Sequence, residues 1–355
     1  MNDNEEIFKL LINHEGFQIR QNTFEGCSKL KEIIIPSFVT TIENGAFYYC
    51  TSLSIVDIPS SVTSIGDKAF SNCMMIKQIR IPDSVTSIGS HAFDKCTKLA
   101  NIEIPPSVTE IGEYAFRECI RLQRASLPST IEEIKNGLFQ YCSSLIEFDI
   151  PSSVTTIGNL AFNQCKSLKE MEIPSTVTSI GSRVFLDCFA LDKIAIHSQL
   201  ALIDDEVFRR CSSLKAINIP PSVTSIGEKT FYKCLSLTKI TFPSSVETIG
   251  SGCFEGCSNL SKVSIPKSVT TINAYAFREC SSLDKISIPS SVTFIGAYAF
   301  SRCALRIIKI PSSVKELGIN ICKGTDTLEE IIAPSDLCKP GTNSFAGFSD
   351  ILKKQ

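Results

Sequence analysis

Cysteine has the widest chemistry of any residue type in this sequence, and thirteen of the sixteen cysteines recur at a constant interval of 23 residues. Regularly spaced cysteines can form a disulfide framework, and close pairs can bind zinc. Cys253 and Cys257 form a C-x-x-x-C pair, but Cys253 replaces an alanine that precedes phenylalanine in other repeats, and no histidine lies nearby. The periodic cysteines are Cys27, Cys50, Cys73, Cys96, Cys119, Cys142, Cys165, Cys188, Cys211, Cys234, Cys257, Cys280 and Cys303.

The constant interval favours burial of these thiols over reactivity. Side chains at equivalent positions of stacked units project in parallel about one unit apart, which fits poorly with the Cβ separation of roughly 3.8 Å in a disulfide. A phenylalanine stands three residues before each periodic cysteine, from Phe24 to Phe300. We therefore predict a cysteine ladder of small, reduced, inert thiols inside a core.

Motifs for catalysis or cofactor binding are missing from the sequence. The histidines His14, His91 and His197 are far apart and form no zinc-protease motif, and there is no G-x-S-x-G or P-loop. The glycine-rich stretch 250–256 misses G-x-G-x-x-G by one residue and falls at a corner of the repeat. We expect no catalytic, cofactor-binding or metal-binding residue, no cofactor and no enzymatic activity.

Charged residues on the predicted solvent side of the strands form two zones. Like charges on adjacent strands repel, so such zones are stable only when they are solvated or face opposite charge. Lysine also commonly covers apolar surface with its long stem, without binding anything. The candidate partner-binding residues are an acidic zone of Glu147, Asp149, Glu170 and Glu172 and a basic zone of Lys239, Lys262 and Lys285, with Lys309 beyond it in the neighbouring column.

One unit departs from the repeat. His197 stands where proline is expected, and Asp204 stands at the glycine position, followed by Asp205 and Glu206. This acidic corner could be a docking point or a weak cation site. Sequence drift is the favoured interpretation, because so short a charge cluster is usually a solvated corner.

The unit that positions these residues reads C-x-x-L-x-x-V-x-I-P-x-x-V-T-x-I-G-x-x-A-F-x-x-C over residues 50–73. A fixed period of this length predicts a solenoid. The alternation before Pro59 indicates a short strand, and the following V-T-x-I a second extended segment. Gly66 suits a corner that needs positive φ or a close backbone approach. The A-F-x-x-C spacing fits one helical turn facing inward.

The predicted fold class is therefore a repeat solenoid of the leucine-rich repeat, α/β type. About 15 stacked units would place a parallel β-sheet on one face and short helical turns on the other. One solenoid is expected over residues 1–355, with a degenerate first repeat at about 5–27, regular repeats over 28–303, and degenerate repeats with a closing cap over 304–355.

The repeat L-x-x-I-x-I-P-x-S-V-T-x-I-G-x-x-A-F-x-x-C resembles the BspA-like leucine-rich repeat family, and the resemblance covers nearly the whole chain. It implies a protein-binding solenoid, and several members are adhesins that engage host matrix or cell-surface proteins. It implies no catalytic residue.

Composition narrows the function classes further. The formal charge of −2 provides no basic field for nucleic acid, and no apolar stretch is long enough to span a membrane. The first residues, 1–6, are acidic and do not read as a secretory signal, so the expected location is the cytoplasm. Cell-surface display by non-classical export is the alternative, and we expect a monomer.

Three functions compete. The leading hypothesis is a non-enzymatic protein–protein interaction scaffold, of adhesin or surface-associated type. A carbohydrate-active parallel β-helix is the second, which would need two carboxylates about 5 to 9.5 Å apart. The third is an intracellular regulatory subunit that docks an enzyme.

Overall fold

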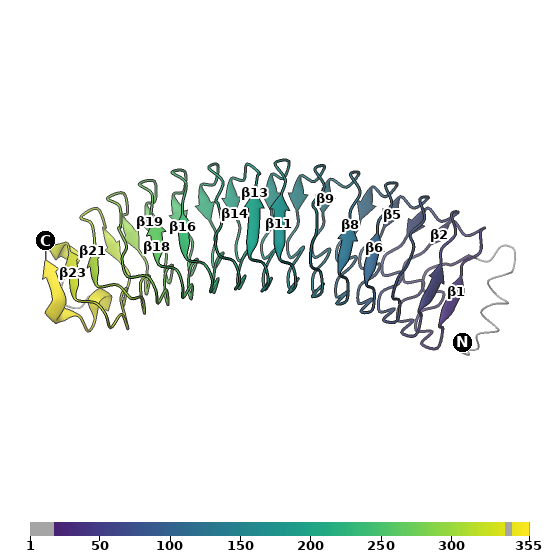
Figure 1. Cartoon of the computed structure of the whole chain (residues 1–355), viewed down its shortest axis with the longest axis horizontal. Helices are drawn as coiled ribbons and strands as arrows, with labels where there is room; N and C mark the ends of the chain where they lie inside the picture. The colour runs from purple at the N-terminus through teal and green to yellow at the C-terminus, as the bar shows by residue number, and fades with distance from the viewer. Residues whose placement is uncertain (1–17, 338–342, 355) are drawn as a thin grey trace. The chain divides into compact units, whose positions relative to one another are not determined.

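The computed structural model describes residues 18–337 and 343–354, and the chain divides into two compact units, Met1–Thr176 and Val177–Gln355. In each unit the chain winds as a parallel β-solenoid, and the chain makes about 14 turns. Figure 1 shows these turns, which we call rungs, as successive narrow loops. The predicted repeat solenoid is confirmed. The single domain over 1–355 stays a prediction, and most of the predicted first repeat lies outside the described residues.

Most rungs carry one or two short strands. We call the surface made by the strands that precede the proline position the strand face. In the first unit these strands are β1 (Glu32–Ile34), β3 (Ile55–Asp57), β6 (Asn101–Glu103), β8 (Arg124–Ser126) and β11 (Glu170–Ile173). In the second unit they are β13 (Lys193–Ile196), β16 (Lys239–Thr241), β18 (Lys262–Ser264), β21 (Ile307–Lys309), β23 (Glu330–Ala333) and β24 (Leu352–Lys354).

The second strand of a rung follows the V-T-x-I segment, as the sequence predicts. In the first unit these are β2 (Thr41–Ile42), β4 (Ser64–Ile65), β5 (Ser87–Ile88), β7 (Glu110–Ile111), β9 (Glu133–Ile134) and β10 (Thr156–Ile157). In the second unit they are β12 (Ser179–Ile180), β14 (Leu202–Ile203), β15 (Ser225–Ile226), β17 (Thr248–Ile249), β19 (Thr271–Ile272), β20 (Phe294–Ile295) and β22 (Glu316–Leu317). Three short 3₁₀ helices, η1 (Ser335–Leu337), η2 (Asn343–Phe345) and η3 (Ser349–Ile351), lie near the C-terminal end.

The expected helical turn of each unit is instead a series of tight turns. Around Phe70, every second N–H bonds the carbonyl three residues earlier, as from Cys73 to Phe70 at 3.1 Å. The N–H groups between them bond the next rung, as from Phe70 to the carbonyl of Ala92 at 2.8 Å. Left-handed φ angles at Lys68 (55°) and Asn72 (63°) allow this alternation and exclude an α-helix. We call this segment, 66–73, and its equivalents the turn face.

A column of fully buried phenylalanines fills the core behind the turn face. Neighbouring rings stack nearly parallel, with centroids 5.2 Å apart at Phe24–Phe47 and 5.8 Å apart at Phe277–Phe300. Twelve members, from Phe47 to Phe300, are below 2% exposed. Because offset stacking adds to area burial, the column supplies much of the cohesion between rungs.

The strand face is interrupted at every third rung. The backbone of residues 78–81, 147–150, 216–219 and 285–288 makes no hydrogen bond to a neighbouring rung within the described chain. We call these four segments the open rungs. The expected sheet is therefore divided into short groups such as β1–β3, β6–β8 and β16–β18, whereas the second strands form longer runs, β2–β4–β5–β7 and β14–β15–β17–β19–β20–β22.

Glycine at the corner after a second strand allows close packing against the preceding rung. A Cβ placed on Gly66 would lie 2.7 Å from the backbone nitrogen of Asn44 in the preceding rung. No real Cβ fits there, so glycine at this position lets the two backbones approach closely beside the second strands. Of the two roles predicted for Gly66, close approach is the one that the structure shows.

The periodic cysteines have a role beyond filling space. All fifteen cysteines in the described chain are buried free thiols. The Sγ of Cys50 donates a hydrogen bond to the carbonyl of Phe24 at 3.0 Å, and the bond recurs as far as Cys303 and Phe277, at 3.1 Å. The thiol is thus a small apolar group that also satisfies a buried carbonyl of the preceding rung.

We expect these thiols to resist labelling in the folded protein. Burial raises the pKa of Cys50 and of Cys257 to about 12, so little thiolate, the reactive form, exists near neutral pH. An aromatic disulfide reagent should therefore react with the column only after denaturant is added. Rapid labelling of many thiols without denaturant, or the recovery of many disulfides, would contradict the ladder. Cys338 lies outside the described residues.

Candidate functional site

The basic zone lies on the strand face of the second unit. Lys239 of β16 is directly opposite Lys262 of β18 in the parallel ladder, and Lys285 lies in the following open rung. All three side chains are exposed, and none forms an ion pair with a carboxylate in residues 18–337 or 343–354. The structure therefore brings together three like charges, none of which is ion-paired within the described residues.

A shallow hollow of about 640 Å³ runs along these lysines. Ile240 and Val263 lie between the lysine column and the small hydroxyl side chains of Thr241 and Ser264, and Asp284 is the single carboxylate that lines the hollow. A partner bound in this hollow would contact an excess of positive charge from the three lysines, and apolar surface from Ile240 and Val263. Lys309 is exposed on β21 but is absent from the lining of this hollow, so it is not grouped with the other three.

The acidic zone lies on the strand face of the first unit. Glu147 and Asp149 lie in the open rung 147–150, and Glu170 and Glu172 lie on β11. All four are exposed. Arg124 of β8 bridges to Glu147, with 3.3 Å between Nε and Oε1, so part of this charge is balanced within the chain. Glu147 and Asp149 also line a hollow of about 740 Å³, together with Glu103 and Arg124, whereas Glu170 and Glu172 are not part of its lining.

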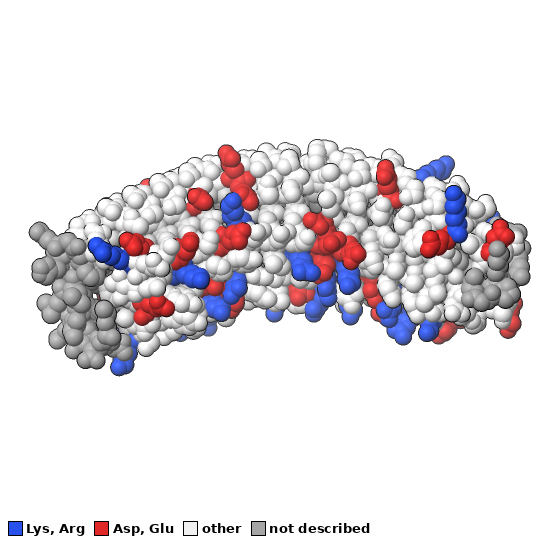
Figure 2. Space-filling view, turned by 180° about the vertical axis from the view of Figure 1, so that it is seen from behind, with Lys and Arg blue, Asp and Glu red and all other residues white. Residues whose placement is uncertain are grey.

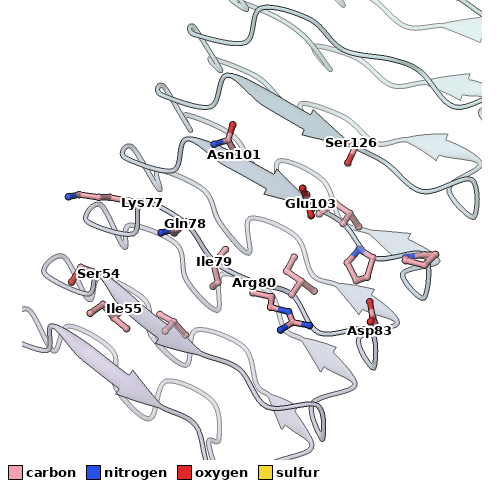
Figure 3. A pocket seen from close by; sticks show the side chains of 15 residues that line it. Ser54, Ile55, Lys77, Gln78, Ile79, Arg80, Asp83, Asn101, Glu103 and Ser126 are labelled. Carbon is pink, nitrogen blue, oxygen red and sulfur yellow. The ribbon is translucent and has the colours of Figure 1, made fainter.

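Another hollow, of about 1080 Å³, lies on the strand face around the open rung 78–81. Figure 3 shows Arg80 and Asp83 from this rung and Glu103 from β6 among its labelled side chains. Its charged lining residues are two basic, Lys77 and Arg80, and two acidic, Asp83 and Glu103, so it selects no single charge. No sequence pattern predicts this hollow. The hollow lies where the backbone of residues 78–81 makes no hydrogen bond to a neighbouring rung in the described chain.

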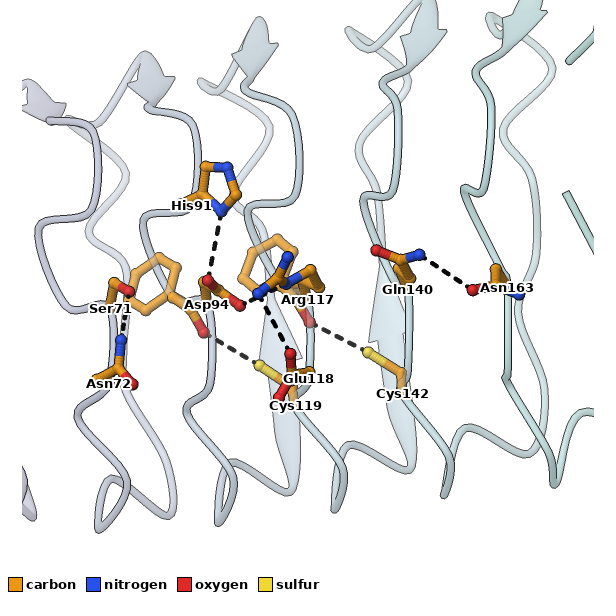
Figure 4. Close-up of polar contacts among 12 residues, drawn as sticks. Ser71, Asn72, His91, Asp94, Arg117, Glu118, Cys119, Gln140, Cys142 and Asn163 are labelled. Atoms are coloured by element: carbon orange, nitrogen blue, oxygen red, sulfur yellow. Dashed lines mark hydrogen bonds and ion pairs between the residues drawn. The ribbon is translucent and has the colours of Figure 1, made fainter. Parts of the chain in front are cut away.

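The turn face carries ion pairs between rungs. In Figure 4, Asp94 accepts hydrogen bonds from His91 (3.3 Å) and from Arg117 of the next rung (3.1 Å), and Arg117 also pairs with Glu118 (3.2 Å). Figure 2 shows Lys and Arg beside Asp and Glu in small mixed clusters on the face that it presents. Such surface pairs contribute little stability individually. Each pair neutralises the charge of its two side chains.

The irregular unit around Asp204 is also satisfied internally. The carboxylate of Asp204 accepts a bond from the N–H of Asp205 (2.7 Å), and the carboxylate of Asp205 accepts one from the N–H of Glu228 (2.6 Å). Burial would raise the pKa of Glu206, but hydrogen bonds from Arg209 and Arg183 hold that pKa below its ordinary value. The structure thus supports the drift interpretation, because these carboxylates have backbone or arginine partners.

Aromatic residues of the turn face were missed by the sequence analysis. Tyr275 and Tyr298 stack with centroids 5.4 Å apart, near the exposed cations Arg302 and Lys323. The 23-residue spacing of the two tyrosines was a signal that could have identified them.

Among the residues that the structure describes, no group of three or more His, Cys, Asp or Glu side chains is placed to hold a metal ion. No helix in the same residues has the length and apolar character needed to cross a bilayer.

Comparisons with known proteins agree with the geometry. The family model described as the BspA type leucine rich repeat region (6 copies) matches residues 17–146, 132–261 and 247–354. A leucine-rich repeat protein from Bacteroides ovatus is 28% identical, with a TM-score of 0.60, over 95% of this chain and 86% of its own. A leucine rich cell surface protein from Faecalibacterium prausnitzii is 32% identical, with a TM-score of 0.63, over 86% of this chain and 88% of its own. No curated protein sequence gives a significant match.

Proposed function

Because this chain belongs to the BspA type leucine-rich repeat family, we propose that it is a non-enzymatic scaffold that binds a protein partner through the basic zone of its strand face. Stacked repeats offer an extended surface on which exposed residues vary over a constant frame. The single observation that carries the proposal is the column Lys239, Lys262 and Lys285, which is exposed and forms no ion pair with any carboxylate in the described part of the chain.

The column favours a partner with an acidic surface. Adjacent strands lie about 4.8 Å apart, so like charges directly opposite each other destabilise the folded protein slightly. An acidic partner removes that repulsion on binding. Clustered charge of one sign also raises association rates at low ionic strength, even when the net charge of the whole protein is near zero.

Reversing the three lysines tests the proposal. The triple variant Lys239→Glu, Lys262→Glu, Lys285→Glu should associate with the partner at least about tenfold more slowly at low salt, and its salt dependence should weaken or invert. Its Tm should hardly change, because all three side chains are exposed. Surface plasmon resonance over a salt series measures the rates.

A matched control reverses three exposed lysines of the first unit, Lys68, Lys77 and Lys169, and changes the net charge by the same amount. This control should keep most of the association rate. Unchanged kinetics in the basic-zone variant, or equal losses in both variants, would overturn the assignment of the site.

We further propose a more specific role, in which the chain is an adhesin-type protein displayed at the cell surface. Its support is the similarity to the Faecalibacterium prausnitzii protein, which is described as a cell surface protein. An antibody against the chain should label intact cells as strongly as permeabilised ones. Labelling only after permeabilisation would favour the cytoplasmic expectation and a regulatory subunit that docks an intracellular enzyme.

A further inference from the structure

All seven tyrosines of the chain lie on the turn face, and the strand face carries none. They occupy segments equivalent to 66–73, and the sequence has no tryptophan. Tyrosine and arginine, with tryptophan, are enriched among the residues that dominate binding energy. A tyrosine ring buries much area with few rotatable bonds. The tyrosines are Tyr48, Tyr49, Tyr114, Tyr141, Tyr232, Tyr275 and Tyr298.

Two of these tyrosines form an ordered, stacked pair in the second unit. The rings of Tyr275 and Tyr298 stack with a centroid distance of 5.4 Å and an interplanar angle of 4°. Asn320 fixes the outer ring by donating a hydrogen bond to the hydroxyl of Tyr298 at 3.0 Å. A hollow of about 380 Å³ adjoins them, lined also by Arg278, Ser301, Arg302, Lys323 and Gly324.

Positive charge is in excess at this hollow. Arg278 pairs with Glu255 (3.1 Å) and with Glu279 (3.3 Å), and Arg302 pairs with the same Glu279 (2.9 Å). Lys323 is exposed and has no carboxylate partner in the described part of the chain. The two arginines thus share two carboxylates, Lys323 adds a third positive charge, and the side chain of Arg302 is 62% exposed.

We propose that this tyrosine–arginine hollow is a second binding site, and that it takes a segment of a partner protein in which an acidic side chain neighbours an apolar one. The carboxylate pairs with Lys323 and the exposed guanidinium of Arg302, and the apolar side chain packs against the tyrosine rings. This site uses none of the residues of the basic zone.

Fluorine NMR of the full chain labelled with 3-fluorotyrosine tests the proposal. The probe is the peptide acetyl-Glu-Leu-Glu-amide, and its neutral match is acetyl-Gln-Leu-Gln-amide. Only the acidic peptide should shift resonances, and the shifts should be confined to Tyr275 and Tyr298, assigned with Tyr→Phe variants. Equal shifts with both peptides, or shifts spread over all seven tyrosines, would overturn the site.

Matched variants distinguish binding of the acidic peptide at this hollow from non-specific electrostatic attraction of the peptide to the whole protein. Lys323→Glu should weaken binding of the acidic peptide about tenfold, whereas Lys68→Glu, an equal charge change elsewhere on the turn face, should leave it unchanged. Glu279→Gln should strengthen binding, because it releases Arg302 from its internal partner. Equal weakening by Lys68→Glu and Lys323→Glu would contradict the proposal. Lys262→Glu should have no effect, so this test is independent of the strand-face site.

Discussion

Raising the pH to about 9.5 should unfold this protein. Twelve buried thiols have a pKa raised by burial. In the unfolded chain the same thiols lose their protons near pH 8.5. Between these two pKa values the folded state binds more protons than the unfolded state, so the free energy of unfolding falls as the pH rises.

The expected loss is large because the thiols act together. One pH unit above the unfolded pKa, each thiol costs about 1.4 kcal/mol, or roughly 17 kcal/mol for twelve, which exceeds the usual net stability of about 5 to 15 kcal/mol. Far-UV circular dichroism under reducing conditions over pH 7 to 11 measures the midpoint. The contribution is fully present only well below the unfolded pKa, at about pH 7 and lower.

A double variant provides the control for the thiols. Cys119→Thr with Cys142→Thr removes two of the twelve titrating groups, and the unfolding midpoint should move to higher pH. A folded protein at pH 11, or a midpoint that the double variant does not change, would show that the thiols do not govern alkaline stability.

Truncating a central ring of the phenylalanine column, with Phe162→Ala, should lower the free energy of unfolding by roughly 3 to 5 kcal/mol, as other large core deletions do. Phe162 is fully buried and contacts two other rings, Phe139 at 5.7 Å and Phe148 at 5.0 Å. Its loss leaves a cavity that neighbouring rungs cannot close without breaking ring stacking.

Urea denaturation followed by circular dichroism measures this loss. Lys169→Ala is the matched surface change in the same unit, and it should cost less than about 0.5 kcal/mol. Equal losses for the two variants would mean that the assignment of buried and exposed faces is inverted. Because each repeat contacts only its neighbours, hydrogen exchange should increase mainly in the rungs beside Phe162.

The sequence predicts the core of this fold almost completely, because every rung repeats the same buried positions. The columns of Phe70, Cys73, Val62 and Ile65 are all buried where the period places them. The helical turn was not correct. A-F-x-x-C spacing also fits two successive turns, and the choice depends on hydrogen bonds to the next rung, which one unit alone does not reveal.

The reason for cysteine, as opposed to alanine, appears only in the structure. Thr325 occupies the cysteine position in a late rung, is fully buried, and donates to the carbonyl of Phe300 at 3.1 Å. A hydroxyl thus makes the bond that the thiols make elsewhere. The position requires a small donor, and the thiol meets that need at little desolvation cost.

The candidate site could be predicted in part. The period places Lys239, Lys262 and Lys285 in one exposed column; in the structure Lys239 lies opposite Lys262, and all three line one hollow. The open rungs could not be predicted, because the residues of 78–81 and 285–288 are of the same types as those of the paired strands. The loss of ladder bonds there depends on the spacing of rungs, which no single residue encodes.

Hydrogen–deuterium exchange of the chain with and without its partner tests the strand-face assignment most directly. Residues 285–288 make no backbone hydrogen bond to a neighbouring rung in the described chain, so their amides should exchange rapidly in the free protein. Binding over the basic zone should slow exchange in the peptides that contain Lys239, Lys262 and Lys285. Unchanged exchange at residues 285–288, with protection elsewhere in the chain, would contradict the account.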